Sequence, residues 1–475
     1  MLFSSTVFIY LFLPAVLIGY YVLFRKNRAL QNIFLLLASL LFYAWGEPKF
    51  VLVMMGSIAL NWILGLFVDK FKAQGKINAT KGVIAITCIA NIGMLFIYKY
   101  LNFASDIVCD ILKVDSIVPE IALPIGISFF TFQAMSYVID VYRGKGEVQK
   151  NILNVGLYIA FFPQLIAGPI VRYETVAYEI KYRKETWGDF FDGFARFLIG
   201  VAKKVILANS FAVLADTAFN SCSAGETLSV TFSWLGAIAY TFQIFFDFGG
   251  YSDMAIGLGK MFGFHFLENF DYPYISKSIS EFWRRWHMSL GTWFRDYVYF
   301  PLGGSRVNKP RLIFNLFVTW MLTGIWHGAN WTFFVWGFMY FVLLTVEKLT
   351  GMDKKQGKVI NVFKWIYTMI FVVIGWVIFR AESMGDALIY LASMFGVNHN
   401  TFTDGMFSGY FTQNLVLLIA GAIASTPIFK YMKSKFNKSN VISSAVYVVV
   451  MILLFMICVS SLVSNSYNPF IYFNF

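Results

Sequence analysis

The sequence predicts an all-α, polytopic membrane protein with roughly 11–12 transmembrane helices plus re-entrant and amphipathic helices. Of its 475 residues, 58% are hydrophobic and 13% are charged, whereas a soluble domain carries about 25% charged residues. The 53 Phe and 13 Trp residues are typical of lipid-facing and interfacial surfaces. Lysine and arginine fall mainly in short loops between apolar runs, so the net charge of +12 indicates membrane orientation and argues against nucleic-acid binding.

The first four predicted spans are separated by loops of alternating charge. They cover Thr6–Phe24, Leu30–Trp45, Phe50–Val68 and Gly82–Tyr98. The loops after the first and third spans are rich in Lys and Arg, whereas the loop after the second is not, so the positive-inside rule places the N-terminus outside. The first span lacks a preceding basic residue and a cleavage site, so we expect it to be retained.

The next part of the chain is polar or broken. Leu101–Ile117 is mixed and is expected at the membrane interface. Leu123–Gly144 carries Gln133 among other polar residues, which either pack between helices or line a substrate path. Leu153–Ile170 has two prolines six residues apart. We expect a re-entrant element there, because irregular backbone at membrane depth occurs only inside protein or beside a water-filled cavity.

The run Phe194–Asn209 is apolar but contains Arg196, Lys203 and Lys204. As a surface helix, its lysines would extend into the lipid headgroups. As a span, it would need carboxylate or phosphate partners for these charges. The sequence leaves both alternatives open.

A better span, Leu228–Phe246, ends in the Gly-rich stretch D-F-G-G-Y-S-D, which holds Asp247 and Asp253. Because the spacing of a phosphate-binding P-loop is absent, we expect a tightly packed turn that lines an internal chamber.

The remainder predicts amphipathic helices and five more spans. His265–Arg306 is aromatic and basic and is expected on the inner side of the membrane. The later spans are Leu312–Trp326, Trp331–Val346, Val362–Phe379, Leu415–Ile428 and Val441–Val463. Basic loops between them place the C-terminus outside. We expect one integral domain, with N-terminal spans at 1–150, a core at 151–350 and C-terminal spans with a tail at 351–475. The four cysteines show no Cys-x-x-Cys spacing, so neither a metal site nor a disulfide is expected.

Two histidines stand in long motifs within this core. His287 lies in W-R-R-W-H-M-S-L-G-T-W-F-R-D-Y, and His327 lies in T-G-I-W-H-G-A-N-W. A buried imidazole costs free energy unless it is hydrogen-bonded or used, and a lone one is usually a bonded core residue. Here nearby glycines allow close approach of backbone or ligand. The tryptophans around His327 are either pocket walls, core or lipid-facing: Trp320, Trp326, Trp331 and Trp336.

These two motifs, in this order and with their histidines 40 residues apart, resemble the membrane-bound O-acyltransferase (MBOAT) family. Within it, the bacterial branch that O-acetylates exported polysaccharides is the most similar. The resemblance implies the fold of that family and the transfer of an acyl group, expected to be acetyl, across the membrane onto an extracellular envelope polysaccharide. It implies that His327 is the catalytic base and that His287 is a second catalytic group.

The same resemblance implies where the reaction partners come from. The donor is acetyl-CoA or an acyl carrier protein on the cytoplasmic side, with no cofactor held by the chain. An exported SGNH-type acyltransferase or esterase is the expected partner, and the bacterial cell membrane is the expected location. We expect a narrow passage between the membrane faces lined by Gln133, Asp247, Asp253, Trp326 and Asn330. We expect a donor-docking surface formed by Arg284, Arg285 and Arg295.

Three alternatives stay open at this point. D-alanyl transfer to teichoic acid shares the motifs. A transporter or flippase would also use broken helices and buried polar residues, although no inverted repeat is visible. A scaffold subunit of a polysaccharide export machine would leave both histidines dispensable. The other two histidines, His265 and His399, are assigned to structure or loops.

The final stretch N-P-F-I-Y-F-N-F, Asn468–Phe475, is either an aromatic interfacial anchor or a functional tail. It resembles the C-terminal tyrosine motif of a small membrane peptide that works with the D-alanyl-transferring member of the family. That resemblance implies a tail that places the Tyr472 hydroxyl near His327 as an acyl relay. A phenol, with a pKa of about 10, is activated by a histidine more readily than an alcohol.

Overall fold

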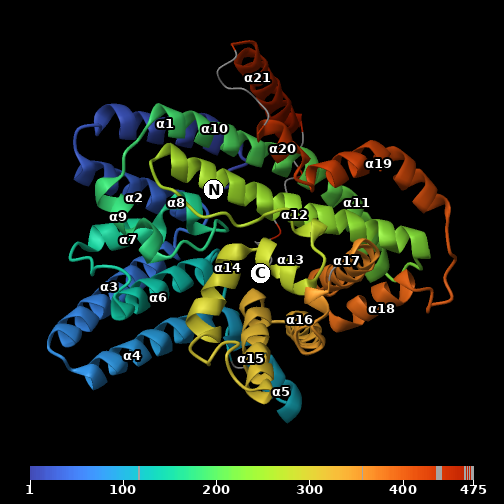
Figure 1. Ribbon diagram of the computed structural model, residues 1–475, viewed down its shortest axis with the longest axis horizontal. Coiled ribbons are helices and arrows are strands. Elements are labelled where there is room, and N and C mark those ends of the chain that lie inside the picture. Colours follow the sequence, from blue (N-terminus) through green and yellow to red (C-terminus); the bar gives the residue numbers. More distant parts are fainter. Residues whose placement is uncertain are drawn as a thin grey trace. The chain divides into compact units, whose positions relative to one another are not determined.

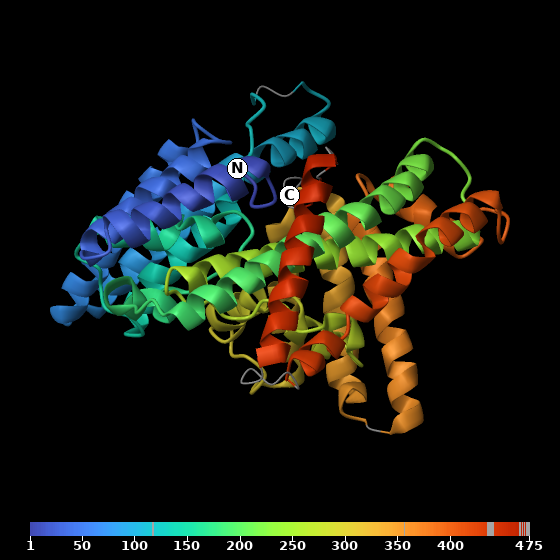
Figure 2. The same ribbon diagram turned by 90° about the horizontal axis from the view of Figure 1, so that it is seen from above.

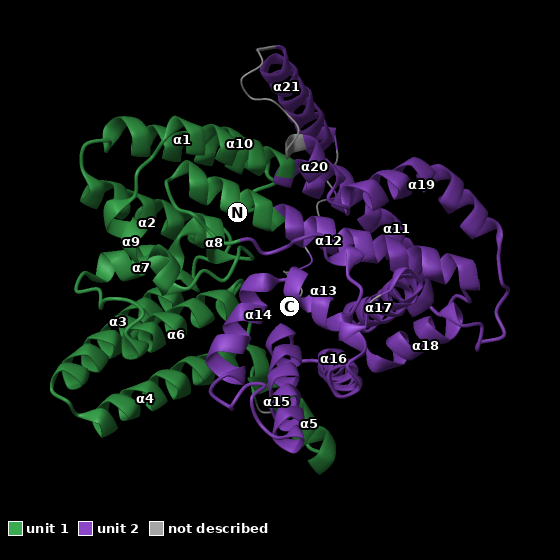
Figure 3. Cartoon of the chain, viewed as in Figure 1, with its two compact units in different colours: residues 1–199, 251–267 green, residues 200–250, 268–475 purple. Residues whose placement is uncertain are grey.

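The computed structural model of the chain describes residues 1–115, 118–355, 357–434, 441–464, 467, 469 and 471 (Figure 1). All regular elements in these ranges are helices, as expected. The chain divides into two compact units (Figure 3). The first unit holds residues 1–199 and 251–267, and the second holds residues 200–250 and 268–475.

Seven helices in the described ranges are long and apolar enough to cross a membrane. They are Val51–Ala73, Ile77–Leu112, Trp187–Ser223, Trp331–Thr350, Lys358–Arg380, Gly405–Ala424 and Ile442–Ser464. Three shorter apolar helices add to them, at Phe8–Leu23, Arg28–Ala44 and Met384–Met394. The number differs from the expected 11–12 because the first two predicted spans form helices that are too short. The runs around Asp247 and before His327 mix polar residues into their helices.

The first unit is built mainly from the N-terminal helices. They are α1 (Leu13–Ile18) between the π-helical turns η1 (Phe8–Phe12) and η2 (Gly19–Leu23), α2 (Arg28–Ala44), α3 (Val51–Ala73), α4 (Ile77–Leu95), η3 (Phe96–Tyr100), α5 (Leu101–Leu112), α6 (Ile127–Arg143), α7 (Ile152–Ala160), α8 (Phe162–Leu165), α9 (Tyr173–Tyr182) and α10 (Trp187–Ala202). Helices α10 and α12 (Val230–Met261) each continue from one unit into the other.

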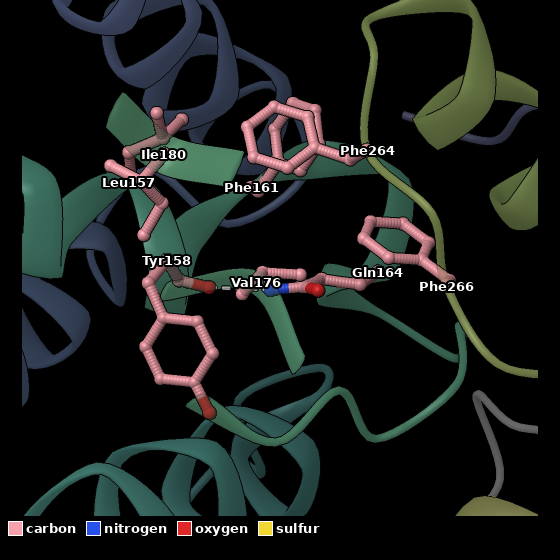
Figure 4. A pocket seen from close by; sticks show the side chains of 8 residues that line it. All are labelled: Leu157, Tyr158, Phe161, Gln164, Val176, Ile180, Phe264 and Phe266. Carbon is pink, nitrogen blue, oxygen red and sulfur yellow. Dashed lines mark hydrogen bonds between the residues drawn. The ribbon is translucent and has the colours of Figure 1, made fainter. Parts of the chain in front are cut away.

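The expected interruption between residues 153 and 170 is present. Helix α7 ends at Ala160, and the ψ of 115° at the next residue, Phe161, leaves the helical region; residues 155–171 are buried. The broken backbone groups find side-chain partners. The Gln164 amide donates to the Tyr158 carbonyl (Figure 4), and the Phe162 N–H donates to Ser39 Oγ over 3.0 Å. Irregular backbone is tolerated here because protein supplies these bonds.

A small pocket lies beside this break. Its lining comes from α7, α8, α9 and the segment after α12, and consists of Leu157, Tyr158, Phe161, Gln164, Val176, Ile180, Phe264 and Phe266 (Figure 4). Apolar side chains make up most of this wall, so the recess belongs to the packing around the break in α7.

The second unit contains both motif histidines. Its remaining helices are η4 (Lys203–Ala208), α11 (Asn209–Ser223), η5 (Pro273–Ile275), α13 (Ile279–Arg285), α14 (Met288–Phe294), η6 (Arg295–Tyr299), α15 (Lys309–His327), α16 (Trp331–Thr350), η7 (Met352–Lys354), α17 (Lys358–Arg380), α18 (Met384–Met394), α19 (Gly405–Ala424), α20 (Ile428–Ser434) and α21 (Val441–Ser464). Helix α21 contacts η4, which is part of the long helix Trp187–Ser223. Figure 2 shows α21, in red, crossing this green helix.

The charged residues in the run 194–209 have carboxylate partners. Helices α10, η4 and α11 form one apolar helix, Trp187–Ser223. Within the first unit Arg196 pairs with Asp253 at 2.8 Å, and within the second unit Lys204 pairs with Asp247 at 2.7 Å. Of the two alternatives for this run, the helix with carboxylate partners is therefore the one the structure supports.

Helices α15 and α16 pack through glycines. A Cβ on Gly324 would lie 2.5 Å from the Phe333 carbonyl oxygen, and one on Gly337 would lie 2.7 Å from the Trp320 carbonyl oxygen. Both contacts are far too short for any side chain. The two glycines thus serve backbone-to-backbone packing, which fixes the end of α15 where His327 lies.

Candidate functional site

His287 occupies a left-handed turn between α13 and α14, with φ of 44° and ψ of 51°. Few non-glycine residues adopt this conformation without local support. The support comes from Asn269, which is fully buried. Its carbonyl oxygen accepts from the Met288 N–H over 2.9 Å, and its Oδ1 accepts from the Ser289 N–H over 3.1 Å and from Ser289 Oγ over 2.9 Å.

The same Asn269 oxygen assigns the tautomer of His287. Nδ1 of His287 lies 3.3 Å from Oδ1 of Asn269. Because the Ser289 backbone N–H can only donate, the Asn269 atom that faces both groups is the oxygen and not the amide nitrogen. Nδ1 must then carry the proton, so Nε2 holds the lone pair of a neutral ring.

Burial keeps His287 neutral. The residue is 2% exposed, and desolvation lowers its pKa from 6.5 to about 3. Between these two values the unfolded chain binds one more proton than the folded one. Folding stability is therefore fully present above pH 6.5 and falls as the pH drops toward 3.

A buried carboxylate positions the helix that leads into this turn. Glu347 of α16 is fully buried. It accepts from the Ile279 N–H over 2.6 Å and from the Ser280 N–H over 2.9 Å, both in the first turn of α13. A negative charge is favoured at a helix N-terminus, so Glu347 ties α13, and with it His287, to α16.

His327 is the last residue of α15 and is 6% exposed. Aromatic rings surround its imidazole: the ring centroids of Trp326, Trp336 and Phe379 lie 5.0, 5.1 and 5.1 Å away. Trp326 also lies 6.0 Å from the ring of His287. The structure therefore brings both motif histidines into ring contact with one indole within the second unit.

The four tryptophans near His327 in the sequence differ in their exposure. Trp326 and Trp336 are buried, at 4% and 0% exposure, whereas Trp331 is 52% exposed. Trp320 is half-buried. Of these four, Trp326 and Trp336 are therefore the buried residues that pack against the His327 ring.

The other residues predicted to line a passage are divided between the two units. Gln133 is buried in α6 and Asp253 pairs with Arg196, both in the first unit. Asp247 and Asn330 belong to the second unit. Asn330 caps α16 by accepting from the Thr332 N–H and donates to the Glu382 carbonyl oxygen over 2.8 Å. A passage lined by all of them stays a prediction.

The three candidate docking arginines differ in their availability. Arg284 and Arg295 are exposed, and Arg295 pairs with Asp296 next to it in the sequence. Arg285 is bound to Asp271 and Glu281 at 3.0 and 3.1 Å. Docking of a donor by these arginines stays a prediction.

The remaining histidines lie in structural or loop positions. His265 is half-exposed and lies 2.8 Å from Glu179 in the first unit. His399 is an exposed loop residue with a φ of 53°.

The described part of the C-terminal segment enters the second unit beside Asp247. The Ile471 N–H donates to Asp247 Oδ2 over 3.0 Å, and Lys204 donates to the Pro469 carbonyl oxygen. Asp247 directly precedes Phe248, whose ring centroid lies 4.7 Å from that of His287. The predicted relay residue, Tyr472, lies outside the described residues.

Sequence reasoning missed Asn269, Glu347 and Lys204 as parts of the site. Each is a buried polar residue in an aromatic or apolar stretch, and that contrast was the available signal. Their partners are far away in the sequence, and no spacing rule connects them.

Comparison with known proteins places the chain among relatives of similar length. The model of MBOAT, the membrane-bound O-acyltransferase family, matches residues 147–380, a range that includes both motif histidines. The chain is 43% identical over 399 residues to the probable alginate O-acetylase AlgI of Pseudomonas aeruginosa, covering 83% of this chain and 75% of that one. It is 38% identical over 500 residues to the protein of the same name from Pseudomonas putida, covering 100% of both. The peptidoglycan O-acetyltransferase of Helicobacter pylori is 34% identical over 430 residues, covering 84% of this chain and 80% of that one.

Proposed function

Because the chain belongs to the membrane-bound O-acyltransferase family, we propose that its two buried histidines transfer an acetyl group from a cytoplasmic thioester toward an extracellular envelope polysaccharide. The protein is a multi-pass membrane acyltransferase. The single observation that carries the proposed chemistry is the pair of buried imidazoles that both contact the ring of Trp326. A transporter or a scaffold has no need of this pair.

In the proposed reaction His327 acts as the general base. It takes the proton of the acceptor hydroxyl as that oxygen attacks the thioester carbonyl. The tetrahedral intermediate then collapses, the carbon–sulfur bond breaks, and the imidazolium returns its proton to the leaving thiolate. The donor is acetyl-CoA or an acyl carrier protein, and the chain holds no cofactor of its own.

The tautomer of His287 supports a proton-accepting role for this residue. Its Nδ1 proton is committed to Asn269, so a neutral His287 presents only a lone pair at Nε2 and cannot donate there to an oxyanion. His287 therefore accepts the hydrogen bond of a substrate or relays a proton. It does not stabilise the tetrahedral intermediate as a donor.

The names of the relatives favour acetyl as the group transferred, since they describe two alginate O-acetylases and one peptidoglycan O-acetyltransferase. We place the protein in the bacterial cell membrane with both termini outside, and an exported SGNH-type acyltransferase or esterase completes the transfer to the polymer. Membrane vesicles supplied with labelled acetyl or D-alanyl thioesters separate this proposal from D-alanyl transfer.

The central test is His327→Ala. Loss of a general base lowers the rate by about 100-fold or more, so we expect labelled acetyl transfer in vesicles to fall by that factor at normal protein levels. His265→Ala is the matched control, because His265 is half-exposed and bonds to Glu179, and it should retain activity. Full activity of a well-expressed His327→Ala protein is the result expected of a scaffold.

We further propose that Tyr472 carries the acyl group between donor and exported partner. The bond from Ile471 to Asp247 supports this, because Asp247 neighbours Phe248 at the ring of His287. Tyr472→Phe removes a single oxygen and keeps the aromatic ring. Acetylation of the envelope polymer should stop in this variant, and an acetyl group on Tyr472 should be detectable by mass spectrometry in the wild type. A normal rate of polymer acetylation in the variant would mean that the tail is only an interfacial anchor.

A further inference from the structure

Lys204 and Asp247 form an ion pair in the interior of the second unit. Lys204 lies on η4 and Asp247 on α12, with 2.7 Å between Nζ and Oδ1, and each side chain is 2% exposed. A buried ion pair recovers its desolvation cost only when further hydrogen bonds satisfy its remaining donors and acceptors. The identity of those further partners therefore indicates what the pair is for.

Both charged groups bind the backbone of the C-terminal segment. Lys204 donates to the carbonyl oxygen of Pro469, and Asp247 Oδ2 accepts from the N–H of Ile471 over 3.0 Å. A cation thus binds a carbonyl, and an anion binds an N–H two residues further along. The ion pair is therefore specific for the direction of the peptide backbone that it binds. These bonds do not involve the side chains of residues 469 and 471.

The segment that reaches this pair is held at two earlier points. Ser461 of α21 donates to the Val205 carbonyl oxygen over 3.3 Å. The Tyr467 hydroxyl donates to Asp216, which is paired with Arg380. Exposure falls from 37% at Tyr467 to 7% at Ile471. The chain therefore passes from the surface of the unit into its interior.

We propose that Lys204 and Asp247 are a backbone-binding site for the protein's own C-terminal segment, here called the tail clamp. The clamp fixes Ile471 beside Asp247. The residue after Asp247 is Phe248, whose ring contacts the ring of His287. Lys204 and Asp247 are thus positioning residues that act through the tail. The clamp itself is independent of acyl transfer, and only its consequence for catalysis rests on the function proposed above.

The first test changes the tail alone. Ile471→Pro removes the N–H that Asp247 accepts, and Ile471→Val keeps both the N–H and the apolar side chain. The full-length protein in detergent is treated with a carboxypeptidase, and the loss of C-terminal residues is followed by intact mass. A charge-assisted hydrogen bond predicts digestion about tenfold or more faster for Ile471→Pro and an unchanged rate for Ile471→Val.

The second test removes the clamp. Replacing a buried ion pair by apolar residues of similar size is often neutral for stability, so Lys204→Met with Asp247→Leu should fold and release the tail. Arg28→Met with Glu185→Gln is the control, since Arg28 and Glu185 pair within the first unit. Equal digestion rates for the wild type, Ile471→Pro and the clamp double variant would overturn the proposal. A monodisperse elution profile confirms that each variant is folded.

Acetyl transfer by the same variants separates the clamp from the relay. Faster digestion together with lost transfer supports a clamped tail that takes part in catalysis. Faster digestion with normal transfer keeps the clamp and rejects Tyr472 as the relay. Loss of transfer in Tyr472→Phe without faster digestion in the clamp variant keeps the relay and rejects the clamp.

Discussion

Asn269 controls His287 in two ways, through the backbone turn and through the ring tautomer. One side-chain oxygen faces two donors on Ser289 and the Nδ1 of His287, and the backbone oxygen holds Met288. At metal sites, mutation of a group that orients a ligand in this way commonly lowers metal affinity or activity by a factor of about 10 to 100. We regard Asn269 as a positioning residue on this ground.

We expect Asn269→Leu to lower the turnover rate by about 10- to 100-fold, because the acceptor that fixes the Nδ1 proton is lost. Asn269→Asp keeps an acceptor oxygen but adds a negative charge, which favours the protonated form of His287 and raises its pKa. The rate of the Asp variant should therefore fall on the acidic side and recover as the pH rises. In the wild type the pKa of His287 of about 3 produces no such loss above pH 5.

Ser289→Ala provides the comparison for both changes. It removes one donor to Asn269 but leaves the bond to His287 in place, so its pH–rate profile should match the wild type. A purely structural role for Asn269 would be indicated if the Leu and Asp variants lost activity equally at every pH.

Helices α15 and α16 place His327 by direct backbone contact at Gly324 and Gly337. The histidine lies three residues after Gly324, on the last turn of α15. Any widening between the two helices would therefore move His327 relative to Trp336 and Phe379. The precision of this part of the site depends on packing between the two helices as well as on the histidine motif.

For Gly324→Val we expect a loss of about 1–3 kcal/mol in the free energy of unfolding, together with reduced acetyl transfer. The added side chain meets the Phe333 carbonyl oxygen 2.5 Å away. Gly93→Ala in α4 is the control, because nothing lies within 4 Å of a Cβ at that position, and it should be neutral or slightly stabilising. Thermal unfolding in detergent measures both changes.

The sequence allowed prediction of the elements that depend on local pattern. The break at Phe161 followed from the prolines, and the helix that ends at His327 followed from the apolar run before it. The purpose of Gly324 did not follow, because its partner Phe333 belongs to the next helix. The run around Lys204 stayed ambiguous for the same reason, since only the folded chain brings Asp247 to it.

At the level of the whole chain, composition and the two motifs were enough to predict the fold class and the family. The described residues hold seven long apolar helices and three shorter ones, against the 11–12 spans expected, since hydropathy along the sequence does not distinguish a lipid-facing helix from a polar helix enclosed by others. The two-unit division also had no signal in the sequence, since α10 and α12 each continue through it.

The orientation in the membrane gives a prediction for the whole molecule. Lys49 and Gln74 are exposed on either side of α3, and the charge pattern of the loops places Lys49 outside and Gln74 inside. Lys49→Cys should react with a membrane-impermeant maleimide in intact cells, whereas Gln74→Cys should react only after permeabilisation. The opposite pattern would invert the orientation proposed for both termini.

The carboxylate that ties α13 to α16 also has a consequence for biosynthesis. Glu347 is made about 60 residues after His287, yet it satisfies two buried N–H groups at the start of the helix that precedes that histidine. Until α16 has left the ribosome, those donors lack their partner, and an unmet buried donor is costly. A nascent chain halted before residue 347 would thus already contain the His287 motif and Asn269, while the first turn of α13 still lacked its carboxylate. The helix that leads into the earlier histidine motif is therefore completed only after translation of the later motif.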